Sequence, residues 1–133
     1  MIGKINSINV DHCINSGQVF LWDKIKENWY GVNGEEILRI DSAGKIQSSK
    51  NQDNDFFRKQ DDLPEIFKKI KKDAIVKQAV KEFLGLRILR QDPFQCYISF
   101  IVSSNSNIMM IRKRLKLLCQ KFGKKLNCSS WSF

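Results

Sequence analysis

The stretch QDPFQCYISFIVSSNSNI, from Gln91 to Ile108, joins an apolar run to five consecutive small polar residues, 103–107. Asp92 followed by Pro93 predicts a helix start, because an aspartate side chain caps free backbone amides and proline needs no donor at the first helical position. We expect this helix to run to about Val102 and to be buried, since it is apolar nearly all round. A turn between two buried helices needs only one or two polar residues. The longer polar stretch therefore predicts a surface that contacts another molecule.

A second, basic helix is predicted after the polar stretch, from near Asn107 to Gly123, a residue type common just past a helix end. Apolar residues at spacings of three and four predict the side that faces the core: Ile108, Ile111, Leu115 and Leu118. The outward side carries Arg112, Lys113, Lys116 and Gln120. The amino end of this helix favours a phosphate, because free amides and the helix dipole attract anions there. Asn107 is expected to cap the helix, with contact to a nucleic-acid base as the alternative.

Upstream of about residue 54, apolar residues recur at period two, which is typical of strands. The runs are KINSINV (4–10), QVFLWDKI (18–25), NWYGV (28–32), EEILRI (35–40) and KIQSS (45–49), separated by turn-forming residues. They predict an antiparallel meander. From there to Gly85 the period lengthens and predicts two short helices. Their apolar faces are Leu63, Ile66, Phe67 and Ile70, and then Ile75, Ala79, Val80, Phe83 and Leu84. The predicted fold class is therefore α+β.

The composition limits the classes of protein to consider. A length of 133 residues with 42% hydrophobic content suits one modest domain. No run reaches the roughly 18 apolar residues that span a membrane, and the amino terminus lacks a signal-peptide core, so we expect a cytosolic protein.

The four cysteines give little support for a metal site. Neither a CxxC pair nor a second histidine is present, which argues against zinc. The thiols are expected to be reduced and mostly buried: Cys13, Cys96, Cys119 and Cys128. Asp11, His12 and Cys13 are not expected to act together, because neighbours on a strand point to opposite faces.

The net charge of +9 is unevenly distributed. The first 50 residues balance, whereas seven Lys or Arg and no acid follow Ile108. A basic run is often only a solvated face, but this asymmetry favours a polyanionic partner, most commonly nucleic acid. An asparagine in the polar turn can hydrogen-bond a base edge while neighbouring charges hold the backbone. The residues alone thus predict a nucleic-acid-binding α+β domain.

Three separated motifs resemble the 8-oxoguanine DNA glycosylase/AP lyase family. They are SGQVFLW at 16–22, GLRILRQDPFQCYISFIVSSNSNI at 85–108 and LCQKFGKKL at 118–126, and NWYGVNGEEILRI and FFRKQDDL fit the same order. The resemblance covers roughly residues 5–126. It implies a TATA-binding-protein-like N-terminal domain, an antiparallel sheet packed with helices, at 1–90. The first helices of the helix-hairpin-helix glycosylase domain are implied at 91–126, and 127–133 is an atypical tail.

The resemblance also implies site residues. Gly17, with Gln18 and Phe20, is implied to recognise the lesion base, the Gly17 carbonyl accepting from N7–H of 8-oxoguanine, whereas N7 of guanine is itself an acceptor. Asn105, with Ser106 and Asn107, is implied to fill the vacated duplex position and contact the orphaned cytosine. Phosphate contacts are implied for Arg112, Lys113 and Lys116. The family implies no metal and no cofactor, and double-stranded DNA containing oxidised guanine as the partner, in the nucleoid of a prokaryote or the nucleus of a eukaryote.

The sequence departs from the family pattern at several places. Ser106 stands where many members have a second asparagine, and Leu21 and Met110 replace common arginines, so recognition of the opposite base is expected to be altered. The family's nucleophilic lysine and activating aspartate lie in motifs absent here, so no catalytic residue is assigned. Phe100, Ile101 and Ile108 are then expected to expose apolar surface.

Three hypotheses follow from these departures. The first is the N-terminal half of a glycosylase for oxidised purines, catalytically incomplete alone. The second is a non-enzymatic DNA-binding module. The third is an inert remnant, or a fragment that needs a second chain with the catalytic half.

Overall fold

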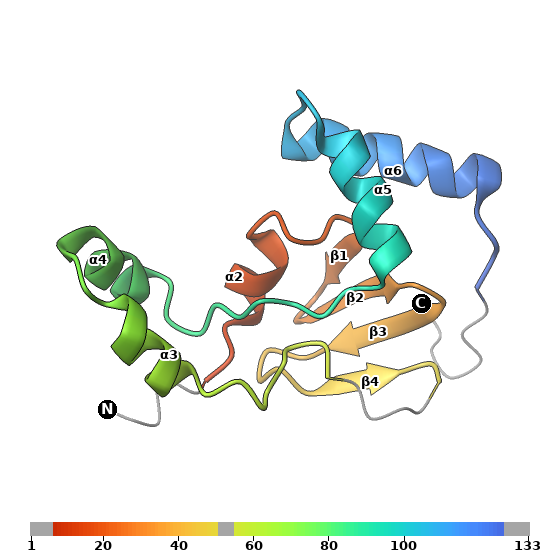
Figure 1. Ribbon diagram of the computed structural model, residues 1–133. Helices are drawn as coiled ribbons and strands as arrows, with labels where there is room; N and C mark the ends of the chain where they lie inside the picture. The colour runs from red at the N-terminus through yellow and green to blue at the C-terminus, as the bar shows by residue number, and fades with distance from the viewer. Residues whose placement is uncertain (1–6, 51–54, 127–133) are drawn as a thin grey trace.

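The computed structural model describes residues 7–50 and 55–126. It contains a small antiparallel sheet with helices around it (Figure 1). The elements in chain order are α2 (Val10–Asn15), β1 (Trp22–Ile25), β2 (Asn28–Asn33), β3 (Glu36–Ile40), β4 (Ile46–Ser48), α3 (Leu63–Ile70), α4 (Ala74–Glu82), α5 (Pro93–Ser103) and α6 (Ile108–Phe122). The helices α3 and α4 lie at one end of the molecule, and α5 and α6 lie at the other (Figure 1). No helix in the described ranges is long and apolar enough to cross a membrane.

The sheet has the order β1-β2-β3-β4, with each strand antiparallel to its neighbour. The predicted meander is confirmed for four of its five runs, because short turns join strands whose alternate residues enter one core. Trp22 pairs with Gly31, and a Cβ on Gly31 would lie 2.0 Å from the Trp22 ring, so only glycine fits there. The main hydrophobic core consists of Val10, Cys13, Ile14, Val19, Trp22, Trp29, Leu38, Ile40, Phe56, Phe57 and Leu89.

The predicted first strand is wrong. Within the described part of that run, residues 7–9 form no strand, and α2 begins at Val10. The Asn9 side chain accepts a hydrogen bond from the His12 amide at 2.9 Å, which caps the helix. Val10, Cys13 and Ile14 then fall at helical spacing and are buried. The helix signal was present in the sequence but was outweighed by the alternating pattern before it.

The helices α3 and α4 occur where predicted, capped by Asp62 and Asp73. Helix α4 ends at Glu82, three residues before Gly85. Gly85 was expected to end this helix. The structure instead requires glycine there because its φ is +83° and because a Cβ would lie 2.7 Å from the Asn9 backbone nitrogen. The apolar faces are only partly buried, since Leu63 and Val80 are covered while much of the remainder is exposed.

The helices α5 and α6 match their predicted bounds. The Asp92 side chain caps α5 through the Gln95 amide at 2.8 Å, and Gly123 follows the last residue of α6. The prediction that α5 is buried is wrong, because Ser99 is its one buried residue. Exposure of Phe100, Ile101 and Ile108 is confirmed. On α6, Ile111 and Leu115 are buried as predicted, whereas Ile108 and Leu118 are exposed.

The prediction of mostly buried thiols is also wrong. Cys13 is buried, but Cys96 and Cys119 are exposed on α5 and α6. Both lie on helices whose apolar faces are covered by few other residues in the described chain. Apolar neighbours in the sequence therefore did not bury these two thiols. Cys128 lies outside the described residues.

Candidate functional site

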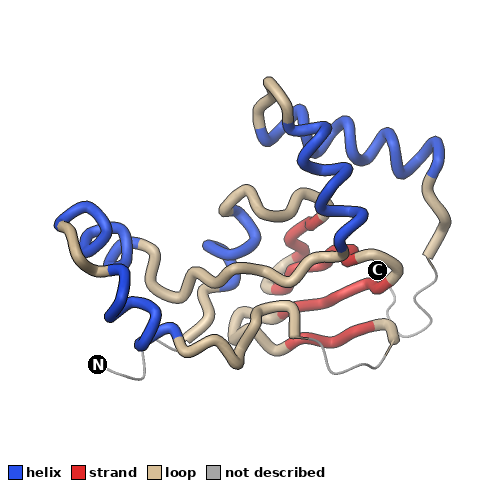
Figure 2. Tube along the Cα trace, viewed as in Figure 1, coloured by secondary structure: helices blue, strands red, loops and turns tan. Residues whose placement is uncertain are grey.

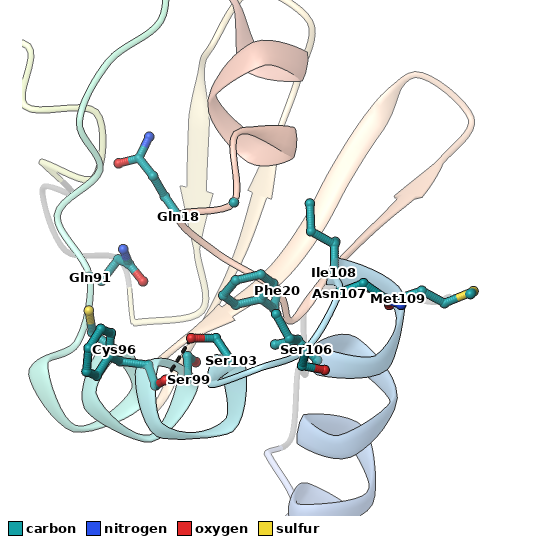
Figure 3. A pocket seen from close by; sticks show the side chains of 13 residues that line it. Gln18, Phe20, Gln91, Cys96, Ser99, Ser103, Ser106, Asn107, Ile108 and Met109 are labelled. Carbon is teal, nitrogen blue, oxygen red and sulfur yellow. Dashed lines mark hydrogen bonds between the residues drawn. The ribbon is translucent and has the colours of Figure 1, made fainter.

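A groove of about 880 Å³ lies between the segment that follows α2 and the two helices α5 and α6 (Figure 3). One wall comes from Gly17, Gln18 and Phe20. The opposite side is built mainly from α5 and from the start of α6. Its residues are Gln91, Cys96, Ser99, Phe100, Ser103, Ser106, Asn107, Ile108, Met109 and Ile111. Two segments that the sequence singled out separately, residues 17–20 and the polar turn, thus meet at one groove.

Gly17 is exposed on the groove wall with a φ of +85°. A Cβ built there would meet nothing within 4 Å, so the backbone conformation and not crowding requires glycine. Among the described residues, no group donates a hydrogen bond to its carbonyl. The carbonyl of this groove-lining residue is therefore an acceptor without a donor among the described residues.

Gln18 has its polar atoms engaged within the protein. Its Nε2 donates to the Arg87 carbonyl and to Ser16 Oγ, both at 3.0 Å, and its Oε1 accepts from the Leu89 amide at 2.9 Å. The side chain therefore presents its aliphatic part to the groove while its amide holds the neighbouring chain segment. A direct role in base recognition stays a prediction.

Phe20 connects the two halves of the molecule. Its side chain is 8% exposed and packs with Ile111 and Leu115 of α6, forming a second, small core. Leu21, Ile98 and Val102 pack against that cluster and are partly buried. In Figure 3 the Phe20 ring lies between the start of α6 and the α5 side of the groove. Phe20 thus supports the groove as well as lining it.

The polar turn places its residues differently from one another. Asn105 is exposed at a φ of +50°, a conformation that asparagine tolerates better than most residues, and it does not line the groove. Ser106 lines the groove, and its buried Oγ has no hydrogen-bond partner in the described chain. Asn107 accepts from the Met110 amide at 2.9 Å, so the capping interpretation is confirmed. Asn105 makes no capping bond of this kind among the described residues, and it is exposed.

The predicted phosphate-binding residues have different surroundings. Lys113 is exposed, whereas Lys116 is paired with Asp23 of β1 at 3.0 Å. Arg112 is half-buried, and its Nε has no partner among the described residues. None of the three lines the groove, and the groove lining contains no lysine, arginine or carboxylate. The groove is therefore a neutral cavity with positive charge beside it.

Sequence reasoning missed most of the α5 wall. Cys96, Ser99 and Ser103 lie at spacings of three and four along α5 and face the groove. A stripe of small side chains on an otherwise apolar helix was visible in the sequence and could have indicated this face. Gln91, just before the helix, had no comparable signal.

Two perturbed titratable groups lie outside the groove. The carboxylate of Asp11 accepts hydrogen bonds from the Lys24 ammonium and from the Trp29 indole N–H. Both bonds lower the pKa of the Asp11 carboxyl, and the bond from Lys24 has the larger effect. Burial raises the pKa of the Cys13 thiol. Asp11 thus belongs to an exposed ion pair, whereas Cys13 belongs to the main core. The two residues are close in sequence but lie in different environments.

Comparison with known proteins places these features in a family. Residues 2–97 match the family model described as 8-oxoguanine DNA glycosylase, N-terminal domain. The N-glycosylase/DNA lyase of Saccharomyces cerevisiae is 32% identical over 88 residues, which are 66% of this chain and 23% of that protein. The N-glycosylase/DNA lyase OGG1 of Arabidopsis thaliana is 40% identical over 60 residues, 44% of this chain and 16% of that protein.

Solved structures agree with this result. MBOgg1 in complex with a low-affinity DNA ligand superimposes with a TM-score of 0.82 at 28% identity, covering 97% of this chain and 47% of its own. The Clostridium acetobutylicum 8-oxoguanine glycosylase/lyase, bound to double-stranded DNA with cytosine opposite 8-oxoguanine, gives 0.79 at 31% identity, covering 93% and 46%. This chain spans less than half the length of these relatives. The sequence resemblance and the α+β prediction are thereby confirmed, and the chain belongs to the 8-oxoguanine DNA glycosylase family.

Proposed function

We propose that this chain takes part in the excision of oxidised guanine from duplex DNA and that its groove receives the extruded base. The observation that carries the proposal is the meeting of two segments at one groove: the wall from Gly17 to Phe20 and the polar turn that ends α5. In this proposal residues 1–90 form the base-recognising domain and 91–126 the first helices of the glycosylase domain. The protein would then work where the DNA is, in a nucleoid or a nucleus.

Base discrimination is proposed for the Gly17 carbonyl. An oxidised guanine offers N7–H, a donor, whereas unmodified guanine offers an N7 lone pair that a carbonyl repels. The carbonyl has no donor of its own in the described chain, so a lesion base would satisfy an otherwise unpaired acceptor. A site of this kind discriminates well because the wrong base leaves a polar group unpaired.

Contact with the duplex is proposed for the other end of the groove. Asn105 extends from the turn and is suited to enter the space that an extruded base leaves. Lys113 and Arg112 follow in the first turns of α6 and are suited to phosphate. Affinity that depends on phosphate contacts falls as salt rises. Both segments would therefore hold the duplex while the groove reads the base.

The nucleophile is proposed to come from outside the groove lining, which has no amine. A lysine amine would attack the sugar C1′ as the glycosidic bond breaks and the oxidised base leaves, and β-elimination from the resulting Schiff base would then expel the 3′-phosphate. No residue of the groove lining supplies this amine. Phe94, Tyr97 and Ile101 expose an apolar surface of α5, and Phe100, which lines the groove, is exposed as well. We infer that this surface packs against the amine-bearing polypeptide, whether it continues the same chain or belongs to a second one.

Fluorescence anisotropy with two labelled duplexes tests the proposal. One carries a single 8-oxoguanine opposite cytosine, and the other carries guanine at that position. We expect tighter binding to the lesion duplex and a loss of affinity for both duplexes in Asn105→Gly. Glycine accepts the positive φ of residue 105, so this variant removes the side chain without straining the backbone. Equal affinity for the two duplexes would reject lesion recognition and favour the non-enzymatic DNA-binding module.

Gly17→Ala tests the groove wall. Alanine is strained at a φ of +85° although there is space for its methyl group, so the carbonyl is expected to turn and lesion preference to fall. Gly44→Ala is the control for backbone strain, since Gly44 has a φ of +79° and lies outside the groove lining. A methyl group there would also lie 3.3 Å from the Ile8 side chain, so this control is the more demanding substitution for stability. Borohydride trapping on the lesion duplex is expected to give no covalent band with this chain alone. A lesion-specific band would show that one of its own lysines is the nucleophile.

A further inference from the structure

The segment between α4 and α5 is extended but belongs to no sheet in the described chain (Figure 2). The Arg90 amide donates to the Phe56 carbonyl and the Arg87 amide to Cys13 Sγ, and four other backbone groups of the segment are held by carboxamide side chains. Gln18 donates to the Arg87 carbonyl at 3.0 Å and accepts from the Leu89 amide at 2.9 Å. Asn33 donates to the Arg90 carbonyl at 3.3 Å and accepts from the Asp92 amide at 2.7 Å. Each side chain thus bonds the segment as a neighbouring strand would.

A third carboxamide makes the reciprocal connection from α5. Gln95 Nε2 donates to the Val32 carbonyl at 2.8 Å, and its Oε1 accepts from the Gly34 amide at 2.9 Å. Asparagine and glutamine alone combine an amide donor and a carbonyl acceptor as a peptide group does. Gln18, Asn33 and Gln95 are called the carboxamide clamp below. The clamp ties the groove wall and the β2–β3 hairpin to the start of α5.

The clamp matters for the groove because little else connects its two sides. The second core contains three buried residues, Phe20, Ile111 and Leu115. Beyond this cluster, the Lys116–Asp23 pair joins α6 to the sheet, and that pair is exposed. The segment before α5 is also anchored by Leu89, which is buried in the main core, and by the Arg90 amide, which donates to the Phe56 carbonyl at 2.8 Å. Beyond Arg90, the bonds of Asn33 and Gln95 join the start of α5 to the β2–β3 hairpin, so they contribute to the direction in which α5 leaves the sheet.

We propose that Gln18, Asn33 and Gln95 are positioning residues that fix the groove width and, through it, the preference for the lesion base. The second half of this proposal rests on the proposed function, whereas the first half concerns the free protein alone. Gln95 is the residue to change, because it does not line the groove and cannot touch a base there. An effect of Gln95 on base preference must then act through position.

Gln95→Glu makes the clamp sensitive to pH. An ionised carboxylate still accepts from the Gly34 amide but faces the Val32 carbonyl without a donor, whereas a protonated carboxyl has one. Folding therefore favours the protonated form and raises the pKa of the introduced group. The clamp is complete below the ordinary glutamate pKa of about 4.3 and is lost as pH rises through the raised pKa. The charged groups on the surrounding elements are Asp92, Glu35, Glu36, Asp55, Lys50 and Arg90. Lys50 pairs with Glu35 and Arg90 with Asp55, so these four charges largely offset one another.

The experiment compares Gln95→Glu with Gln47→Glu, which adds the same charge at an exposed site on β4. Amide resonances of Gly17 and Ser99 report on the two groove walls in the free protein, and anisotropy gives the affinity ratio for lesion and plain duplexes. In Gln95→Glu we expect the resonances to move as the pH is lowered from 8 to 4, and the affinity ratio to fall on the order of tenfold at pH 8 with recovery at pH 4. Gln47→Glu is expected to behave as wild type.

The two readouts separate the proposals. If the Gly17 and Ser99 resonances of Gln95→Glu match those of Gln47→Glu at every pH, the clamp does not fix the groove width, and that part of the proposal is rejected whatever the DNA affinities are. Moving resonances with an unchanged affinity ratio would overturn the link from the clamp to base preference. A wild-type protein without lesion preference would reject the proposed function, and the clamp would then be judged on the resonances alone.

Discussion

Phe20→Ala should detach α6 from the sheet more than it unfolds the sheet. Phe20 is 8% exposed and is one of three buried residues in the second core. A buried phenylalanine removes about 150–250 Å² from water, which at about 25 cal/mol per Å² corresponds to roughly 4–6 kcal/mol as an upper estimate. Measured Phe→Ala losses in cores are about 3–5 kcal/mol. Because Leu21, Ile98 and Val102 are only partly buried and can move into the space, we expect about 3 kcal/mol.

The assay must separate local from global unfolding. Native-state hydrogen exchange, read by mass spectrometry on peptides from α6 and from β2–β3, gives an opening free energy for each. A loss of about 3 kcal/mol corresponds to roughly a hundredfold faster exchange in α6, since each 1.4 kcal/mol is a factor of ten. The sheet peptides should change much less, because Trp22, Trp29, Leu38 and Ile40 belong to the other core.

Phe94→Ala is the matched control. Phe94 is 73% exposed on α5, so the same substitution removes little buried surface and should change stability by about 0.5 kcal/mol or less. Equal effects of the two substitutions, or an unchanged exchange rate in α6 of Phe20→Ala, would refute the view that Phe20 holds the groove together.

Two further predictions concern charged residues. Arg87 is buried and donates to three backbone carbonyls in the 57–61 loop. Arg87→Met should therefore lower the free energy of unfolding by about 3 kcal/mol, and Arg87→Lys should lower it by less. A thermal melt of Arg87→Met like that of the wild type would contradict this. Asp11 has a lowered pKa, so its contribution is present above the ordinary aspartate pKa of about 3.9 and lost as pH falls through the lowered value. Asp11→Asn keeps an acceptor for Trp29 but loses the exposed Lys24 pair, so urea unfolding should show a loss of about 0.5 kcal/mol at pH 7. This loss should shrink as pH falls below the ordinary aspartate pKa, and a loss that is equal at pH 7 and at low pH would rule out the ion pair as its cause.

Local signals in the sequence predicted most of the secondary structure. Alternating apolar residues located four strands, and Asp92, Asn107 and Gly123 marked the ends of α5 and α6 within a residue. The failures occurred where two local signals competed or where burial depended on distant residues. Asn9 started a helix inside an alternating run, and α5 was apolar in sequence but exposed in space.

The sequence by itself thus determined the strands, the helix caps, the basic helix and the polar turn, and its motifs indicated the family. These features depend on side-chain periodicity and on hydrogen bonds between residues a few positions apart. The groove was decided by tertiary structure alone. Gly17 and Ser106 are far apart in the chain and meet because Phe20 packs on α6 and because carboxamides bind the segment before α5. Such contacts depend on which distant surfaces fit together, and this information is not contained in any local pattern.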